Sequence, residues 1–259
     1  MKNIITRLIN KSLAWSGLEL RRKVVNTPLP FDPQMPVEVN EFERNIINEC
    51  GKFSMTGCVR MWALIQSMKH VSYNKINGAF VECGVWRGGN LALMRRFSDY
   101  HKISRPIFGY DTFEGMTAAT SVDVDLFGAR ASDLMRNTPK RENTHNIHAY
   151  VGLQQVEKNL KSLNCHQGIR LIKGKVEETL IVPENLPSEI SILRLDTDWY
   201  ESTKMELEVL YPRLVRGGVL IIDDYGHFKG AQKAVDEYFA NQNVWLHYID
   251  YTCRLMIKG

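Results

Sequence analysis

Short apolar runs alternate with amphipathic stretches along most of the chain. Runs of strand length occur at Pro106–Tyr110, Ile169–Ile172, Ile190–Leu195 and Val219–Ile222, and an earlier one begins at Gly78 and leads into a glycine-rich turn. Helical periodicity marks residues 38–75, interrupted by a loop at Gly51–Gly57, then the segment from Leu91, Gln154–Leu163 and Ala231–Ala240. Buried strands separated by helices are typical of an α/β protein with a parallel sheet. The pattern therefore predicts a doubly wound sheet.

The last two of these parallel strands form the clearest βαβ unit. Between them, Thr203 and Glu206 have the spacing of a capping box that opens a helix, and Gly217-Gly218 is expected to close it. A crossover of this kind makes the two strands parallel. Val244–Ile249 and Cys253–Ile257 follow as an antiparallel hairpin. We therefore expect a mostly parallel, seven-stranded sheet with an antiparallel C-terminal end.

Four carboxylates follow the two strands of this unit. Asp196 and Asp198 come after the first strand, and Asp223 and Asp224 after the second. Because ligands bind at the carboxyl ends of parallel strands, these groups should converge on one binding edge, where they repel unless a cation lies among them. Asp196, Asp223 and Asp224 offer only oxygen ligands, which favours Mg²⁺, Mn²⁺ or Ca²⁺. The alternative for Asp223-Asp224 is a cap on the following turn.

The turn after the first strand contains glycines where the backbone has to approach a ligand closely. These are Gly84, Gly88 and Gly89, which do not form the G-x-G-x-x-G pattern of dinucleotide-binding folds. Glu82 places a carboxylate at the strand end, which suits a ligand with an ammonium or sulfonium group better than a pyrophosphate. Asp111 ends the next strand, where an acidic residue accepts hydrogen bonds from a ribose. The alternative is an ordinary strand-to-helix turn.

Residues 115–150 lack strong periodicity and are rich in Asp, Ser, Thr, Asn and His. A loop of this length inside a compact domain is usually a lid or a binding segment. His145 and His148 in this lid, and His227 after the aspartate pair, are either candidate bases or ordinary surface or core histidines. Trp199 and Tyr200 either stack on a sugar ring or pack in the core.

Net charge separates the N-terminus from the rest of the chain. Residues 1–25 carry a charge of +5, which leaves −1 for the remainder of a chain with +4 in total. The body therefore gives no case for nucleic-acid binding. Residues 1–20 form a basic amphipathic pattern, followed by a proline-rich linker that ends at residue 40. Such a helix either contacts an anionic membrane surface or packs on its own domain or on a second subunit, as in a homo-oligomer.

The cysteines indicate the compartment. The five of them are scattered and contain no C-x-x-C pair, which fits free thiols in a reducing environment better than a disulfide framework or a zinc site. We therefore expect a cytoplasmic protein, held at the inner face of the membrane if residues 1–25 bind there.

Four segments resemble the macrocin O-methyltransferase family. They are Phe80–Asn90 (FVECGVWRGGN), Asp111–Gly115 (DTFEG), Leu193–Thr203 (LRLDTDWYEST) and Tyr211–Tyr225 (YPRLVRGGVLIIDDY). The similarity runs through residues 50–242, and the combination is specific although no single segment is. The resemblance implies a class I methyltransferase domain over residues 41–259, with S-adenosylmethionine and Mg²⁺ as cofactors.

The resemblance also implies roles for individual residues. Those expected at the cofactor are Glu82, Gly84 and Gly88 at its methionine end, Asp111 at the ribose, Gly174 and Lys175 at the adenine, and also Trp86, Gly89 and Asp196. The metal ligands would be Asp196, Asp223 and Asp224. Asp196, and after it Asp198, would lie closest to the hydroxyl proton, with water or a histidine as the alternative base. The family commonly has Asp-Gly-Asp where this chain has Thr197 between the two aspartates.

We therefore expect methyl transfer to a hydroxyl of a sugar or glycan whose neighbouring hydroxyls chelate the metal. A small catechol-type phenol offers the same pair of oxygens and is an alternative acceptor. A nucleotide-dependent oxidoreductase or epimerase would share the sheet, but it needs a better glycine fingerprint and has no use for the aspartate pair. A non-catalytic scaffold would have no use for carboxylates that are so costly to cluster.

Overall fold

The structure, a computed structural model, describes residues 35–259, so the helix and the membrane contact expected in residues 1–25 lie outside it. Within the described range, seven strands form one sheet in the order β3-β2-β1-β4-β5-β7-β6. They are β1 (Ala79–Cys83), β2 (Ile107–Asp111), β3 (Ile169–Lys173), β4 (Ile190–Leu195), β5 (Leu214–Ile222), β6 (His247–Tyr248) and β7 (Arg254–Ile257). β1 to β5 run parallel, whereas β7 pairs antiparallel with β5 and with β6. The predicted fold class is confirmed.

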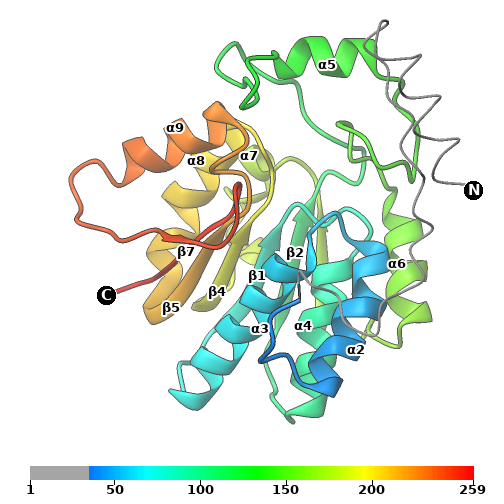
Figure 1. The fold of residues 1–259 in the computed structure, drawn as a ribbon, viewed down its shortest axis with the longest axis vertical. Helices are drawn as coiled ribbons and strands as arrows, with labels where there is room; N and C mark the ends of the chain where they lie inside the picture. The colour runs from blue at the N-terminus through cyan, green and yellow to red at the C-terminus, as the bar shows by residue number, and fades with distance from the viewer. Residues whose placement is uncertain (1–34) are drawn as a thin grey trace, which may run out of the picture. The chain divides into compact units, whose positions relative to one another are not determined.

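Helices cover both faces of this sheet (Figure 1). One layer contains α2 (Glu41–Cys50), α3 (Cys58–Tyr73) and α4 (Gly89–Tyr100), which pack against one another; a second contains α7 (Val176–Thr179), α8 (Tyr200–Val209) and α9 (Lys229–Tyr238). α5 (Ala131–Asn137) lies in the expected lid, away from the sheet, and α6 (Leu153–Ser162) follows that lid. Short 3-10 turns complete the described elements at η2 (Gly51–Phe53), η3 (Pro183–Asn185) and η4 (Tyr211–Arg213).

Alternate residues of the central strands face opposite helix layers, because side chains alternate along a strand. On one face, Val81, Leu193 and Leu220 are fully buried in a core that also contains Leu207 of α8 and Val235 of α9. Burying side chains of this size stabilises the fold by roughly 1.5–3 kcal/mol each. The residues next to them on β1 and β4 face the other layer, and two of those are the buried charged residues Glu82 and Arg194.

The predicted capping box is wrong, because α8 begins at Tyr200 and not near Thr203. Trp199 is the N-cap residue, and its side chain makes no capping hydrogen bond. Instead, the backbone N–H of Tyr200 donates to the carboxylate of Asp123, 2.8 Å away in the lid. Glu206 is fully buried within the helix. A contact from a distant segment thus replaces the local cap that the sequence suggested.

The predicted helix end at Gly217-Gly218 is also wrong, because both glycines lie in β5. The helix ends at Val209, and Pro212 in the following turn has no N–H with which to continue it. Gly217 has a φ of +80°, and the pairing of β5 with β4 skips from Leu214 to Val219 around it. The glycine pair therefore permits a bulge in the strand.

The C-terminal hairpin is present but short. β6 contains only His247 and Tyr248, whereas the apolar pattern predicted a strand over Val244–Ile249. Tyr248 pairs with Arg254 at the edge of the sheet. Among the helices of residues 35–259, none is long and apolar enough to cross a membrane.

Candidate active site

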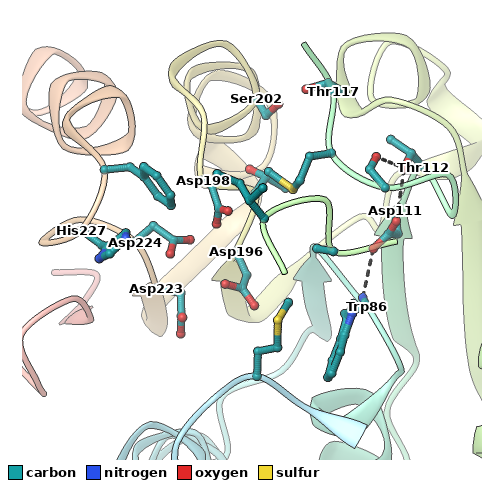
Figure 2. A pocket seen from close by; sticks show the side chains of 18 of the residues that line it. Trp86, Asp111, Thr112, Thr117, Asp196, Asp198, Ser202, Asp223, Asp224 and His227 are labelled. Carbon is teal, nitrogen blue, oxygen red and sulfur yellow. Dashed lines mark hydrogen bonds between the residues drawn. The ribbon is translucent and has the colours of Figure 1, made fainter. Parts of the chain in front are cut away.

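A cavity of about 500 Å³ opens at the carboxyl ends of the parallel strands (Figure 2). Each parallel strand or the turn after it contributes to the lining, as follows: Gly84 and Trp86 after β1, Asp111 of β2, Gly174 and Lys175 after β3, Asp196 and Asp198 after β4, and Asp223 and Asp224 after β5. The lid contributes Thr117, Leu134 and His145. Six of the nine residues expected at the cofactor therefore line one cavity, as do all four aspartates.

The turn after β1 is organised by the carboxylate of Asp111. Its Oδ2 accepts hydrogen bonds from the backbone N–H groups of Val85 (2.7 Å) and Trp86 (3.1 Å), and its Oδ1 accepts one from Phe113 (2.7 Å). Burial raises the pKa of Asp111, although these amide bonds oppose the shift. A Cβ on Gly84, which has a φ of +85°, would lie 1.9 Å from the carbonyl oxygen of Asp196. The first turn and the aspartate turn therefore fit together only with glycine at this position.

Glu82, Gly88 and Gly89 do not line the cavity, contrary to what the sequence suggested for a cofactor contact. Glu82 is buried within β1, 2.8 Å from the guanidinium of Arg194. Gly88 adopts a φ of +89° at the start of α4. A Cβ on Gly89 would lie 2.6 Å from the carbonyl oxygen of Phe53. The two glycines thus allow α4 to begin sharply and to pack closely on the preceding segment.

Three aspartates form a potential cation site. One carboxylate oxygen each from Asp196, Asp198 and Asp224 lies within 4.8 Å of the other two. Figure 2 shows Asp198 and Asp224 pointing toward the same space above Asp196. In the described part of the chain, Oδ2 of Asp224 is buried and has no hydrogen-bond partner. An all-oxygen donor set with an unpartnered buried carboxylate oxygen fits Mg²⁺ or Mn²⁺.

Asp223 differs from this trio, although the sequence predicted it as a metal ligand. Its Oδ1 lies 2.6 Å from Arg194, and its Oδ2 forms an ion pair with Arg60 of α3. Burial alone would raise the pKa of Asp223, but the two guanidinium groups hold it below its usual value. Because both oxygens already accept hydrogen bonds from cations, Asp198 takes the place of Asp223 in the trio.

Arg194 supplies the cation that the acidic cluster requires. Its guanidinium contacts Glu82 (2.8 Å), Asp196 (2.7 Å) and Asp223 (2.6 Å), and it also donates to the hydroxyl of Thr56. Burial would lower the pKa of Arg194, but the three carboxylates raise it well above its ordinary value. Sequence reasoning missed this role, although an arginine inside a six-residue buried strand was a signal for it.

Thr197, which lies between Asp196 and Asp198, is held by a hydrogen bond to α8. Its hydroxyl lies 3.0 Å from Oε1 of Glu206, a fully buried carboxyl group of α8. Burial raises the pKa of Glu206 well above its ordinary value. Asp198, the next residue, has a φ of +65°, which is uncommon for a residue with a side chain. The aspartate turn is thus a constrained segment of backbone.

The other candidates separate into lining and core residues. His145 and His227 line the cavity, and burial lowers the pKa of His227. His148 is buried, with Nε2 2.7 Å from the carbonyl oxygen of Thr138. Trp199 is buried, and Tyr200 does not line the cavity. Sequence reasoning also missed Glu177, which lines the cavity beside Gly174 with a buried Oε2 that has no partner in residues 35–259.

Comparison with known proteins identifies the family of the chain. The family model described as macrocin O-methyltransferase matches residues 38–257. The chain is 32% identical over 193 residues to demethyldecarbamoylnovobiocin O-methyltransferase of Streptomyces niveus, covering 74% of this chain and 69% of that protein. It is 34% identical over 187 residues to the 8-demethyl-8-(2,3-dimethoxy-alpha-L-rhamnosyl)-tetracenomycin-C 4'-O-methyltransferase of Streptomyces olivaceus, covering 71% and 67%.

Solved structures of two methyltransferases have the same fold as this chain. The O-methyltransferase NovP has a TM-score of 0.69 to this chain at 29% identity, over 80% of this chain and 82% of that one. The calicheamicin methyltransferase CalS11 has a TM-score of 0.60 at 18% identity, over 85% and 92% of the two chains, and this likeness shows the fold alone. Because the family model covers most of its length, the chain belongs to the macrocin O-methyltransferase family, as its motifs predicted, and is an O-methyltransferase.

Proposed function

We propose that this protein transfers a methyl group from S-adenosylmethionine to a hydroxyl of a sugar or glycan, with the help of a divalent cation. One observation carries the proposal: the carboxylates of Asp196, Asp198 and Asp224 lie within 4.8 Å of one another, in the cavity that also contains Gly84 and Asp111. The tetracenomycin relative, whose name states that it methylates a rhamnosyl compound, supports a sugar as the acceptor.

Gly84, Asp111 and Gly174 are the proposed cofactor contacts. Gly84 and Gly174 line the cavity at the ends of β1 and β3, where an added Cβ would meet Asp196 and Thr179. Oδ1 of Asp111 accepts a hydrogen bond from the backbone N–H of Phe113 at 2.7 Å. The hydroxyl of Thr112 is 3.5 Å from Oδ1 but only 2.7 Å from the carbonyl oxygen of Gly115, to which it donates, so Oδ1 keeps a lone pair for a ribose hydroxyl. The unpartnered Oε2 of Glu177 is suited to accept a hydrogen bond from an amino group of the adenine. When bound, S-adenosylmethionine supplies a methyl group on a sulfonium sulfur.

Asp196, Asp198 and Asp224 are the proposed metal ligands. A bound Mg²⁺ or Mn²⁺ lowers the pKa of a coordinated hydroxyl and orients its oxygen. Asp223 contributes from outside the trio, because it fixes Arg194 and Arg60 beside the site. Arg194 in turn limits the repulsion between Asp196 and its acidic neighbours.

Asp198 is the better candidate to accept the hydroxyl proton. Burial raises the pKa of Asp196 well above its usual value, but its Oδ2 is paired with Arg194, so only its other oxygen is left for a metal or a proton. In the metal-free protein burial raises the pKa of Asp198 to about 6, and this carboxylate, which has no ion pair among the described residues, has a second oxygen besides the one it offers to a metal. The proton would pass from the hydroxyl to a carboxylate oxygen of Asp198, which leaves an electron pair on the hydroxyl oxygen for its new bond to the methyl carbon. The methyl–sulfur bond would break in the same step, with its electron pair left on the sulfur of S-adenosylhomocysteine. Asp196 remains the alternative that the sequence favoured.

Calorimetric titration of the purified full-length protein is the first test. S-adenosylhomocysteine, the product form of the cofactor, is titrated with and without Mg²⁺, and NAD serves as the control ligand. We expect micromolar binding of the homocysteine compound and no signal with NAD. Binding of NAD, or no binding of the homocysteine compound, would overturn the proposed cofactor.

The acceptor class is tested by mass spectrometry of reaction mixtures. Rhamnosides and other glycosides with neighbouring hydroxyls are compared with a catechol, each with Mg²⁺ and with a chelator. A mass gain of one methyl group on a glycoside, abolished by the chelator, supports the proposal. Methylation of the catechol alone would favour a phenol, and transfer that persists with the chelator would remove the metal from the proposal.

A further inference from the structure

One buried carboxylate, that of Asp123, joins the lid (residues 115–150) to the start of α8, directly after the aspartate turn (Asp196–Trp199). Asp123 is fully buried. Its Oδ1 accepts a hydrogen bond from the backbone N–H of Tyr200 at 2.8 Å. Its Oδ2 accepts two from Thr120, from the backbone N–H at 2.6 Å and from the hydroxyl at 2.8 Å. The same side chain therefore holds a lid segment and the first residue of α8.

The surroundings of this carboxylate leave it little freedom. A Cβ on Gly230 of α9 would lie 1.9 Å from Oδ1 of Asp123, so only glycine lets α9 pack this closely. The backbone N–H of Lys229 also donates to the carbonyl oxygen of Val124, 2.9 Å away. α8 begins two residues after Asp198, and α9 begins five residues after Asp224. Asp123 contacts the first turn of each helix, at Tyr200 and at Gly230.

A small hydrophobic cluster reinforces the junction. Trp199 is buried together with Phe228 and with Ala131 of the lid, while Met116 and Ile147 of the lid pack against them. The indole N–H of Trp199 donates to the carbonyl oxygen of the lid residue Thr117 at 3.1 Å. Trp199 directly follows Asp198, whose φ of +65° is held by this surrounding structure.

We propose that Asp123 is a positioning residue that couples docking of the lid to the geometry of the aspartate turn. Loss of its bond to Tyr200 frees the start of α8, two residues beyond Asp198, and the same change releases the lid at Thr120. An acceptor bound under the lid would in this way favour the turn geometry needed for the metal. The structural coupling stands on the contacts above, and its consequence for metal binding rests on the proposed function.

The proposal is tested by hydrogen–deuterium exchange on the full-length, metal-free protein. Asp123→Asn replaces one acceptor oxygen by an amide donor that must face either the N–H of Tyr200 or that of Thr120. Gly230→Ala displaces the carboxylate without changing its charge. We expect both variants to raise amide exchange across residues 196–203 and in the lid, by about tenfold or more at Tyr200, since a hydrogen bond to a charged acceptor is lost.

Asp125→Asn is the matched control. Asp125 is a second buried lid carboxylate, but its Oδ1 accepts from the backbone N–H groups of Phe127 (2.9 Å) and Ala129 (2.8 Å) within the lid. Its replacement should change exchange near residues 124–131 only. If Asp123→Asn and Gly230→Ala are folded and leave exchange across 196–203 as in the unchanged protein, the coupling is refuted. Thr120→Val, which removes one of the three hydrogen bonds, is the milder variant if the others do not fold.

A second readout separates positioning from general destabilisation. Mn²⁺ affinity, measured by electron paramagnetic resonance, should fall about tenfold in Asp123→Asn and Gly230→Ala, the loss of one charge-assisted hydrogen bond. It should stay within about twofold in Asp125→Asn. Equal Mn²⁺ affinity in all four proteins would refute the effect on the metal site. If the unchanged protein binds neither Mn²⁺ nor S-adenosylhomocysteine, the proposed function fails, whereas the exchange data still decide the coupling.

Discussion

The guanidinium of Arg194 lies 2.6 Å from the carboxylate of Asp223, and both side chains are almost fully buried. The carboxylates near this edge of the sheet differ in whether they form such an ion pair. Asp223 and Glu82 are neutralised by Arg194 and support the site, whereas Asp198 and Asp224 have no ion pair among the described residues and face the cavity. The buried cations therefore set how many carboxylate oxygens remain for a metal: Arg194 takes one from Asp196, and Arg194 and Arg60 together take both from Asp223.

Replacing Arg194 by methionine should destabilise the protein by about 3–5 kcal/mol, because three carboxylates lose their buried partner. Arg216→Met, at an exposed position in the neighbouring strand, is the control and should change stability by less than about 0.5 kcal/mol. Urea unfolding followed by circular dichroism measures both. Equal stability of the two variants would show that Arg194 does not compensate the cluster.

Asp198→Asn should lower kcat by about 10²–10⁴-fold, the usual contribution of a general base. Affinity for S-adenosylhomocysteine should remain, since the proposed cofactor contacts lie on the other strands. Asp133→Asn, on the exposed side of the lid helix α5, should have the activity of the unchanged protein. Methyl-transfer kinetics and calorimetry on the same preparations provide the comparison. Near-normal turnover in Asp198→Asn would exclude this residue as the base.

The pKa of Asp198, raised by burial to about 6, predicts how metal binding depends on pH. Protons compete with the metal for this carboxylate, so Mn²⁺ affinity should decrease as the pH falls through about 6. In the metal-free protein the sign for stability is the reverse. A carboxyl group with a raised pKa in the folded state contributes stability at low pH that is lost as the pH rises through about 6.

Mn²⁺ titrations and thermal unfolding of the metal-free protein, from about pH 5 to about pH 8, check both trends. Asp198→Asn should remove the contribution of this carboxylate to the pH dependence of both Mn²⁺ affinity and thermal stability. A Mn²⁺ affinity that is constant across this range would contradict the involvement of a buried, proton-binding carboxylate.

Gly84→Ala should disrupt the site because its new methyl group meets the backbone of Asp196 at 1.9 Å. Gly128→Ala is a matched control, since Gly128 has a similar φ of +90° but no neighbour within 4 Å of the added Cβ. The control isolates backbone strain, expected at about 1–2 kcal/mol. Gly84→Ala should cost more than the control in urea unfolding and should also weaken S-adenosylhomocysteine binding. Equal costs would mean that the turn after β1 moves freely from Asp196.

Much of the fold could be predicted from local patterns. Strand-length apolar runs identified all seven strands, and parallel pairing brings Gly84, Asp111 and Asp196 to one edge, because the ends of parallel strands lie together. The glycine-rich and acidic turns at those strand ends predicted a binding site there, and these turns line the cavity. The errors at Thr203 and Gly217 arose because a local motif can serve a different purpose once other segments pack on it.

Only the tertiary structure decided which carboxylates are free and what holds them. Arg60 pairs with Asp223 across 163 residues of sequence, and Asp123 reaches Tyr200 across 77. Periodicity assigns a residue to a strand or a helix, but it carries no information on which distant side chain will share its buried space. The composition of the acidic cluster was therefore determined by the sequence, whereas the division of its members between support and metal binding came from long-range packing of buried charges.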